Sequence, residues 1–312
     1  MTGALDIHAA SPDELIAAHR NVFDIWSKGL SLEEHVRYRL NSPKHHLAAW
    51  YVACVDGRVV VSLGAYPLRF RIRGEEVPGI AIGSVYTLAE FRRRGFARQL
   101  LAWVEHQSRK KGAAISLLYS DIRPDYYANM GYILCPSFEG WRDPRGISPP
   151  DVMTHRLVEI PAASHLDELA NLYSCYHGAA PLSIARDAPY WNALLQRFED
   201  DRFFALTDER GQWKGYVRLG RKDSSWRITD YALADQSSAL AEKLYAATIS
   251  LAVENGAQRV GGWLPEVPAA REVFELAPRQ TEITMIKSLS PEHPFDDEQV
   301  ASTSRFCEID HV

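Results

Sequence analysis

The stretch of sequence that decides the fold is SVYTLAEFRRRGFAR, residues 84–98. It passes from a β-rich segment through a loop with three consecutive arginines and Gly95 into a segment with helical periodicity. The first N–H groups of a helix have no partner inside the helix, and the helix dipole adds positive potential there. Gly95 and the small Ala97 leave room for an anion to approach the backbone. This order of residues predicts a strand, an anion-binding loop and a helix.

Positive charge gathers around this loop, although the chain as a whole is acidic. The 312 residues include 35 Lys and Arg against 40 Asp and Glu, which gives a formal net charge of −5. Between residues 90 and 111 the acids are Glu90 and Glu105 alone. Guanidinium groups bind phosphate oxygens strongly, so we interpret the loop as a diphosphate site. The basic residues in this stretch are Arg92, Arg93, Arg94, Arg98, Arg109, Lys110 and Lys111.

The alternative interpretation of the loop is a solvated basic helix start. An arginine run alone favours that alternative. The spacing Arg92-x-x-Gly95-x-Ala97, between a β-rich segment and an amphipathic helix, favours the diphosphate site. The loop matches neither a Walker motif, because no GK[ST] follows, nor the dinucleotide motif GxGxxG.

The rest of the first half alternates between helical and strand-like segments. Residues 11–14 (SPDE) are a good helix start, and residues 31–34 (SLEE) fit a capping box. The dipeptide at 56–57 (DG) predicts a hairpin turn. We expect helices at 12–26, from 31, at 98–111 and from 124, and strands at 46–55, 58–67, 77–87 and 114–119.

The second half repeats this order of elements without visible repetition of residues. The sequence therefore predicts an α/β (α+β) protein with two domains, each a mixed, mostly antiparallel sheet flanked by helices. We expect helices at 164–176, 189–198 and 238–255, and strands at 203–208, 213–219, 226–233 and 259–264.

A turn-forming run, DPRGISPP at residues 143–150, marks the expected domain boundary. We place one domain at residues 1–145 and a second at 146–290. A linker strand at 152–160 is expected to bridge the domains or to be exchanged between them. The polar and acidic residues 291–312 are expected to form a tail.

Composition excludes several classes of protein. The chain is 46% hydrophobic and 24% charged, as is usual for a globular protein. Its mean hydropathy of −0.25 and its short apolar runs predict no membrane partner, and its acidity disfavours nucleic acid. Its four dispersed cysteines form no zinc-ligand pair, so no metal is expected. With no recognisable secretory leader, we expect a cytoplasmic protein, and a homo-oligomer is left open.

A second informative element, DYYANMGY, follows at residues 125–132. Together with the arginine loop it resembles the GNAT superfamily of acyl-CoA-dependent N-acetyltransferases, in detail over residues 80–135. The matching parts are the strand SVYT, the loop Arg92-x-x-Gly95-x-Ala97, the helix that ends near Gly112, the strand AISLLYS and the segment Tyr127-x-x-x-Gly131-Tyr132.

The resemblance implies acetyl-CoA as the acyl donor. Main-chain groups of Val85 and Thr87 would pair with the pantetheine amides as if the ligand were an added strand. The Val85 N–H would also stabilise a developing oxyanion on the thioester. The pyrophosphate would lie on the loop residues Arg92, Arg93, Arg94, Gly95, Phe96, Ala97 and Arg98.

The resemblance also implies a direct attack by a neutral amine on the thioester. Tyr127 aligns with the tyrosine that protonates the departing thiolate, while Tyr126 is expected to be a packing residue. A base must first deprotonate the amine, and Asp121 could do so through water. The alternative for Asp121 is a cap on the next helix. Further candidates for the base are His35, His45 and His46.

In this family the acceptor side comes from the first helices. Asp24 and Trp26 could hold a cationic amine there through charge and ring-face attraction. The alternatives are a surface acid and a core tryptophan. The expected acceptor is a primary amine: a small cationic metabolite, an aminoglycoside-like compound or a lysine.

The two-part plan resembles tandem-GNAT proteins, in particular the first two domains of Eis-type acetyltransferases. In the second half, residues 234–238 (ADQSS) replace the arginine loop, and Asp235 would repel a diphosphate. We therefore expect no acyl-CoA binding there. The residues after Leu289 are too few for the third, sterol-carrier-like domain of the Eis type. The alternative function is a regulatory module that senses acyl-CoA without turnover.

Overall fold

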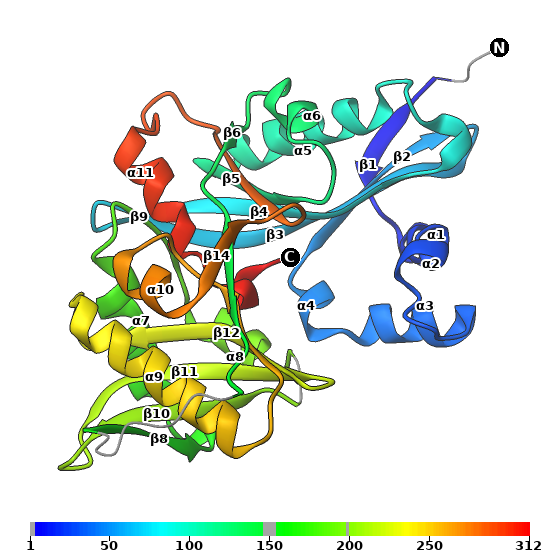
Figure 1. The fold of residues 1–312 in the computed structure, drawn as a ribbon. Coiled ribbons are helices and arrows are strands. Elements are labelled where there is room, and N and C mark those ends of the chain that lie inside the picture. The colour runs from blue at the N-terminus through cyan, green and yellow to red at the C-terminus, as the bar shows by residue number, and fades with distance from the viewer. Residues whose placement is uncertain (1–3, 146–153, 198–199) are drawn as a thin grey trace.

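The computed structural model describes residues 4–145, 154–197 and 200–312. In this part of the chain, two mixed, mostly antiparallel sheets lie one above the other in the view of Figure 1, each with helices packed on it. The expected fold class, an α/β chain with two sheets, is confirmed.

The first sheet is built around the long hairpin of β3 (Arg58–Ile72) and β4 (Glu75–Thr87). β4 pairs in parallel with β5, and the other neighbouring strands pair antiparallel. A short strand from the second half, β9 (Leu182–Ala185), joins the far end of β3. The strand order is β1 (Asp6–Ala9), β2 (Ala49–Val55), β3, β4, β5 (Ile115–Ser120), β15 (Ile283–Ser288) and β6 (Ile133–Leu134).

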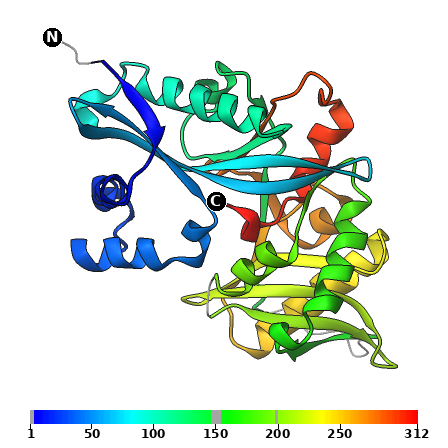
Figure 2. The same ribbon diagram turned by 180° about the vertical axis from the view of Figure 1, so that it is seen from behind.

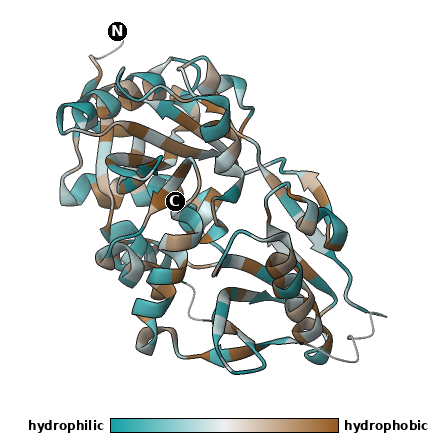
Figure 3. Cartoon of the chain, turned by 90° about the vertical axis from the view of Figure 1, so that its left-hand side faces the viewer, coloured by the Kyte–Doolittle hydropathy of each residue, from teal (hydrophilic) through white to brown (hydrophobic). Residues whose placement is uncertain are grey.

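Helix α5 (Phe96–Lys110) packs on this sheet through one apolar stripe. Leu100, Leu101 and Val104 are buried at helical spacing and belong to one core with sheet residues such as Leu63 and Ile82. Figure 3 shows the same pattern, with hydrophobic colour along the strands and mixed colour on the helices.

The N-terminal helices are α1 (Pro12–Asn21), α2 (Phe23–Trp26), α3 (Leu32–Asn41) and α4 (Pro43–His46). Capping boxes at Ser11 and Ser31 begin α1 and α3, as the sequence predicts. The single helix expected over 12–26 is wrong, because α1 ends at Asn21 and α2 begins at Phe23.

The second sheet repeats the plan with helices α7 (Leu166–Gly178), α8 (Ala188–Leu195), α9 (Ser238–Glu254) and α10 (Pro268–Val273). Its strand order is β14 (Glu275–Pro278), β7 (Phe138–Arg142), β13 (Arg259–Trp263), β12 (Ser225–Leu233), β11 (Trp213–Lys222), β10 (Arg202–Asp208) and β8 (His155–Ile160).

The two halves exchange strands. β7 leaves the first half and pairs with β13 and β14 in the second sheet, while β15 returns and pairs with β5 and β6 in the first. The expectation of an exchanged strand at 152–160 is wrong in its position. Residues 155–160 form β8, which pairs with β10 of its own sheet, and residues 152–153 lie outside the described part.

The polar segment 291–312 folds against the rest of the protein. It contains helix α11 (Asp297–Ser302) and the buried residues Phe306, Cys307, Ile309 and Asp310. Asp310 pairs with the buried Arg186 at 2.8 Å, which removes the cost of burying either charge alone. Within the described residues, no helix is long and apolar enough to span a membrane.

Candidate active site

The first sheet opens between β4 and β5. The two strands pair in parallel from Gly79 and Ile115 to Ile82 and Leu118, and the pairing stops there although both strands continue. Residues 83–87 stay next to β3, while β5 pairs on its far side with β15. In the part of the chain that the structure describes, these β4 residues have no strand on their β5 side.

A β-bulge in β4 changes which main-chain groups of this strand point away from β3. Ser84 and Val85 lie outside the register with β3, and Ser84 has a φ of 53°. The Leu88 N–H donates to the Val60 carbonyl of β3. Because main-chain groups alternate along a strand, Val85 and Thr87 point theirs away from β3, into the opening. The two residues expected to pair with pantetheine thus face the gap.

The loop after β4 presents a row of free amides. Gly95, with a φ of 77°, is the N-cap of α5, and no side chain caps this helix. Within the described residues, the amides of 93–98 donate no hydrogen bond to the backbone. This arrangement suits an anion, because unpaired amides and the helix dipole act together.

The arginines of the loop stand exposed around these amides. Arg94 lies 5.1 Å from the Phe91 ring centroid. Arg92 lies 5.8 Å from the centroid of Tyr86, and its Nε donates to the Thr87 carbonyl at 3.1 Å. Arg92 therefore already uses one main-chain group of the expected pantetheine edge. The Thr87 N–H points to the same side.

Helix α6 (Asp125–Ala128) carries the expected proton donor. Tyr127 is 8% exposed and packs edge-on against Tyr126 and Tyr132, with ring centroids 5.0 and 5.9 Å apart. Burial raises the pKa of Tyr127, and Tyr126 and Asp121 raise it further. Its hydroxyl therefore holds its proton at neutral pH. Tyr126 is 40% exposed and covers an edge of Tyr127.

Asp121 does not cap the next helix, so that alternative is wrong. Helix α6 begins after Pro124 without a side-chain cap. The Asp121 carboxylate instead accepts a hydrogen bond from the Glu282 N–H at 3.1 Å. This contact ties the end of β5 to the start of β15.

Glu282 is an acid that the sequence interpretation missed. It has a φ of 53° and precedes Ile283, which pairs with Ser120 at the end of β5. Burial raises the pKa of the Glu282 carboxyl, and the acids Glu308 and Asp121 raise it further. A half-buried carboxyl whose pKa is raised is a suitable proton acceptor near neutral pH.

The three candidate histidines are held by the main chain of the first helices. Burial lowers the pKa of His45 to about 2, so it stays neutral. The ring contacts are His35 Nε2 with the His19 carbonyl, His45 Nδ1 with the Arg39 carbonyl and His46 Nε2 with the Leu40 carbonyl.

The acceptor side differs from the expectation. Asp24 is exposed, and Trp26, on the same short helix, is neither a core residue nor free. The Trp26 ring lies edge-on to Tyr86 at 6.5 Å, and the Arg39 guanidinium lies 5.4 Å from its centroid. Arg39 also donates to the Ser84 hydroxyl at 3.2 Å. The protein's own cation therefore occupies the ring face expected to bind the substrate.

The end of the sequence reaches the opening (Figures 1 and 2). A Cβ on Gly83 would lie 2.9 Å from the Val312 carbonyl carbon, so only glycine leaves space for this approach. The neighbouring His311 ring packs against Tyr119, with centroids 5.1 Å apart, and its Nδ1 lies 3.8 Å from Glu282. Sequence alone gave no signal for this contact.

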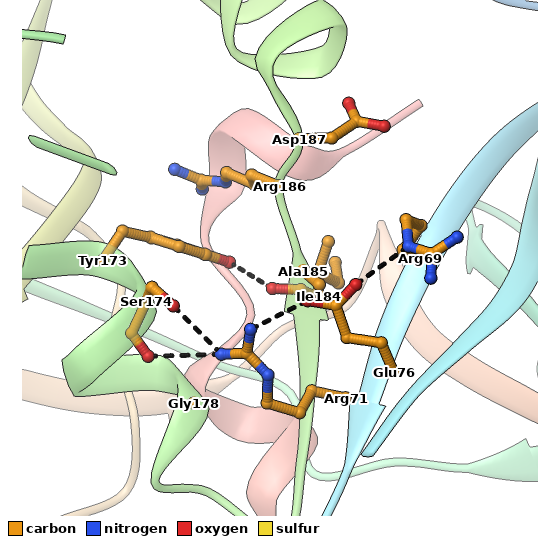
Figure 4. A pocket seen from close by; sticks show the side chains of 10 residues that line it. All are labelled: Arg69, Arg71, Glu76, Tyr173, Ser174, Gly178, Ile184, Ala185, Arg186 and Asp187. Atoms are coloured by element: carbon orange, nitrogen blue, oxygen red, sulfur yellow. Dashed lines mark hydrogen bonds and ion pairs between the residues drawn. The ribbon is translucent and has the colours of Figure 1, made fainter. Parts of the chain in front are cut away.

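A small cavity of about 120 Å³ lies elsewhere, where the far end of the β3–β4 hairpin meets α7 and β9 (Figure 4). Its arginines and Glu76 are already paired, and Asp187 caps helix α8. Arg69 and Arg71 both bind Glu76 at 2.9 Å, and Arg71 also donates to Ser174 of α7. We assign this cavity to the contact between the domains.

Three side chains of the kinds that bind metal ions lie together at the edge of the first sheet. Ligand atoms of His8, Glu14 and Cys54 are within 4.8 Å of one another. Hydrogen bonds account for this cluster: Glu14 binds His8 at 2.8 Å and completes the capping box with Ser11. The expected absence of a metal stays a prediction.

Comparison with known proteins fits this geometry. Residues 8–135 match the family described as "Acetyltransferase (GNAT) domain". This part of the chain is a GNAT acetyltransferase domain. The match spans β1 to β6 and includes the opening, the arginine loop and Tyr127. No curated protein gives a significant match.

Solved structures extend the likeness to both domains. A probable N-acyltransferase of unknown function from Enterococcus faecalis V583 matches with a TM-score of 0.73 and 14% identity, over 92% of this chain and 73% of that one. Eis1 from Mycobacterium abscessus matches with a TM-score of 0.62 and 18% identity, over 92% and 74%. A tandem GNAT protein from the clavulanic acid biosynthesis pathway matches with a TM-score of 0.57 and 16% identity, over 92% and 99%. The fold is therefore a tandem of two GNAT-like domains, as the sequence predicts.

Proposed function

We propose that this protein is an acetyl-CoA-dependent N-acetyltransferase that transfers the acetyl group directly to a primary amine. One observation carries the proposal: the β4 edge that lacks a neighbouring strand is followed, after a short 3-10 helix at Ala89–Phe91, by the free amides of residues 93–98. The edge matches an extended amide ligand, and the amides match a diphosphate. Coenzyme A has both parts in this order.

The binding roles follow from this placement. The amides of residues 93–97 hold the pyrophosphate, and Arg92, Arg94 and Arg98 add positive charge around it. Val85 and Thr87 hold the pantetheine arm along the β4 edge. The acetyl thioester then lies near the bulge at Ser84, beside Arg39.

The chemistry needs three groups. The Val85 N–H faces the opening and stabilises the negative charge that develops on the thioester oxygen. The amine nitrogen forms its bond to the carbonyl carbon, and the carbon–sulfur bond then breaks. Tyr127 gives its proton to the departing thiolate, and its raised pKa keeps the hydroxyl protonated at neutral pH until that step.

The third group is the base that takes the proton of the ammonium. Asp121 and Glu282 stand together at the end of β5, next to the opening. We assign proton acceptance to this pair, with Glu282 as the acceptor and Asp121 as a residue that positions it. Glu282→Gln is then expected to lower kcat at every pH, whereas Asp121→Asn is expected to shift the pH profile.

A screen of amine acceptors with detection of the CoA thiol tests the proposal, run beside calorimetry with acetyl-CoA. Turnover with at least one amine, together with acetyl-CoA binding, supports a transferase. Acetyl-CoA binding without turnover across a broad panel would favour the acyl-CoA-sensing module instead. A lack of acetyl-CoA binding would overturn both functions.

A further inference from the structure

The acceptor side of the opening carries buried positive charge that forms no ion pair with an acid among the described residues. Arg39 is 7% exposed. Its Nε donates to His19 Nδ1 at 3.1 Å, and its Nη2 donates to the Ser84 hydroxyl at 3.2 Å. Within the described residues, no carboxylate lies within the 4.0 Å of an ion pair with Arg39. A buried guanidinium without an anion is costly, so this one calls for a partner.

Other buried arginines of the chain differ in their partners. Arg186 pairs with Asp230 and Asp310 at 2.8 Å each, and Arg218 pairs with Asp201 at 2.9 Å. These two arginines are balanced by acids, whereas the buried Arg279 donates to the Glu282 carbonyl and the Thr284 hydroxyl and forms no ion pair among the described residues. Among the same residues, the hydrogen-bond partners of Arg39 are the neutral side chains of His19 and Ser84.

Lys44 is a second cation near this part of β4. Lys44 is half-buried on α4, with its ammonium 5.9 Å from the centroid of the Tyr66 ring. In the described part of the chain it forms no ion pair either. The Tyr66 ring lies 3.2 Å from the position a Cβ would take on Gly83. Arg39 and Lys44 therefore lie close to Gly83 and Ser84, where the acetyl group is expected.

Several charged groups act on Lys44. Burial lowers the pKa of Lys44, and Arg197, Arg39 and Lys28 lower it further, while Glu282 is the acid that opposes them. Glu282 lies 3.8 Å from His311 Nδ1 and forms no ion pair with Lys44 among the described residues. Asp24, the acid expected to attract a cationic acceptor, is exposed on α2.

A buried hydroxyl lies near the end of β5, where the Tyr119 ring packs against Trp263 and His311. Tyr119, near the end of β5, is 9% exposed, and its hydroxyl has no hydrogen-bond partner among the described residues.

We propose that the acceptor is an amine that also carries an anionic group, a carboxylate or a phosphate, which Arg39 and Lys44 bind. This inference rests on the proposed function, because it places the acceptor beside the thioester. Arg39 sits at Ser84, next to the Val85 amide, so the anionic group lies a short distance from the attacking nitrogen. An α-amino acid has this spacing. A purely cationic acceptor meets repulsion here.

A matched set of acceptors tests the inference. Alanine, alaninamide and isopropylamine differ in whether the carbon beside the amine carries a carboxylate, a carboxamide or a methyl group. With rates corrected for the fraction of free amine, we expect kcat/KM for alanine to exceed that for alaninamide by about tenfold or more, as one charged hydrogen bond predicts. Phosphoethanolamine and ethanolamine form a second pair, which reports whether phosphate serves as well.

Substitutions locate the preference. Arg39→Gln is expected to raise KM for alanine by about tenfold or more and to change KM for isopropylamine little. Arg39→Lys is expected to restore part of the preference. Arg37→Gln removes a charge from an exposed position of the same helix α3 and serves as the matched control. Lys44→Gln gives an independent reading if Arg39→Gln does not fold, as thermal unfolding would show.

The outcomes separate the two proposals. Turnover with equal or better rates for alaninamide, isopropylamine or an aminoglycoside overturns the anionic acceptor and leaves the transferase standing. A preference for anionic acceptors that survives both Arg39→Gln and Lys44→Gln also overturns the assignment. A protein that binds acetyl-CoA but turns over none of these amines overturns the proposed function and this inference together.

Discussion

Each of the two sheets opens between a pair of parallel strands, but only one opening is free. β4 and β5 separate after Ile82, and β12 and β13 separate after Ile228. Each opening has a bulge next to it, at Ser84 in β4 and at Thr229 in β12. The two domains therefore share the backbone feature that a ligand arm would use.

The second opening is filled by the chain itself. The Asp230 carboxylate binds Arg186, which also binds Asp310 from the C-terminal segment. The Tyr231 carbonyl accepts a hydrogen bond from His177 Nε2 at 2.9 Å. In the first sheet the main-chain groups of Val85 and Thr87 have no strand on the β5 side, and among the described residues the Thr87 carbonyl accepts a hydrogen bond from the exposed Arg92 side chain.

The N-termini of α9 and α5 differ in a similar way: side chains cap the first amides of α9 but not those of α5. At α9 the Ser237 hydroxyl accepts from the Leu240 N–H, and the Asp235 carboxylate accepts from the Ser237 N–H. At α5, Gly95 caps without a side chain. A few polar residues thus decide whether this fold receives a diphosphate or excludes one, as expected when function depends on the site and not on the fold.

Gly95→Asp should have the largest effect on ligand binding, because it gives α5 an acidic helix start like that of α9. The new carboxylate would occupy the free amides and repel the diphosphate, and aspartate tolerates the positive φ of this position. We expect acetyl-CoA affinity to fall about 1000-fold, measured by calorimetry.

Gly211→Asp is the matched control for this change. Gly211 has a φ of 76°, is exposed and has open space around it, but lies in a hairpin of the second domain. Its acetyl-CoA affinity should match the wild type. An unchanged affinity in Gly95→Asp would place the ligand elsewhere.

Asp230→Asn tests the filled opening. It leaves the buried Arg186 with Asp310 as its one remaining acid among the described residues, so the free energy of unfolding should fall by about 3 kcal/mol. Acetyl-CoA affinity should not change, since the first opening is untouched. Urea unfolding measures the first quantity and calorimetry the second.

Glu159→Gln is the control for the loss of an acid. Glu159 forms an exposed pair with Arg202 at 2.8 Å in the same sheet. Removing this carboxylate should lower the free energy of unfolding by no more than about 0.5 kcal/mol. Equal losses in the two variants would mean that the buried network does not hold the second opening closed.

Tyr127→Phe tests whether the open side carries the chemistry. Loss of a general acid should lower kcat about 100-fold and leave acetyl-CoA affinity unchanged. Tyr126→Phe, at the exposed neighbour, should change neither. A full-rate Tyr127→Phe would contradict the role of this hydroxyl as the proton donor.

Local features of the site could be predicted from the sequence. The loop at Gly95 and the capping boxes at Ser11 and Ser31 depend on residues within a few positions of one another. The polar start of α9 at Asp235 is equally local. Such patterns fix the backbone with little help from the rest of the chain.

The features that the sequence did not predict join distant segments. The segment 291–312 contains acids such as Asp310 and was therefore expected to be a polar tail. Asp310 is nevertheless buried, because it pairs with Arg186, which is distant in the sequence. Asp121 looked like a cap until Glu282, brought beside it by β15, supplied an N–H. Trp26 looked like a ligand for a substrate cation until the fold placed Arg39 on its ring.

The smallest expected effect concerns a half-buried ion pair at the edge of the first sheet, which contrasts with the fully buried network in the second sheet. Glu14 binds His8 at 2.8 Å. The Ser11 N–H, and then His8, lower the pKa of Glu14 to about 2, while Glu14 raises the pKa of His8. The Glu14 contribution to stability is present above pH 4.5 and is lost as the pH falls towards 2. The His8 contribution is present below pH 6.5 and is lost as the pH rises through its higher folded pKa.

Glu14→Gln isolates this pair, because glutamine can keep the capping box with Ser11. The wild type should exceed the variant in free energy of unfolding most clearly between pH 4.5 and 6.5, the window in which both groups are charged. The side chains are 36% and 24% exposed, so solvent screening keeps the difference below about 1 kcal/mol. Urea titrations at pH 3, 5.5 and 9 measure it. A difference that stays constant across these pH values would mean that packing, and not charge, holds His8 against Glu14.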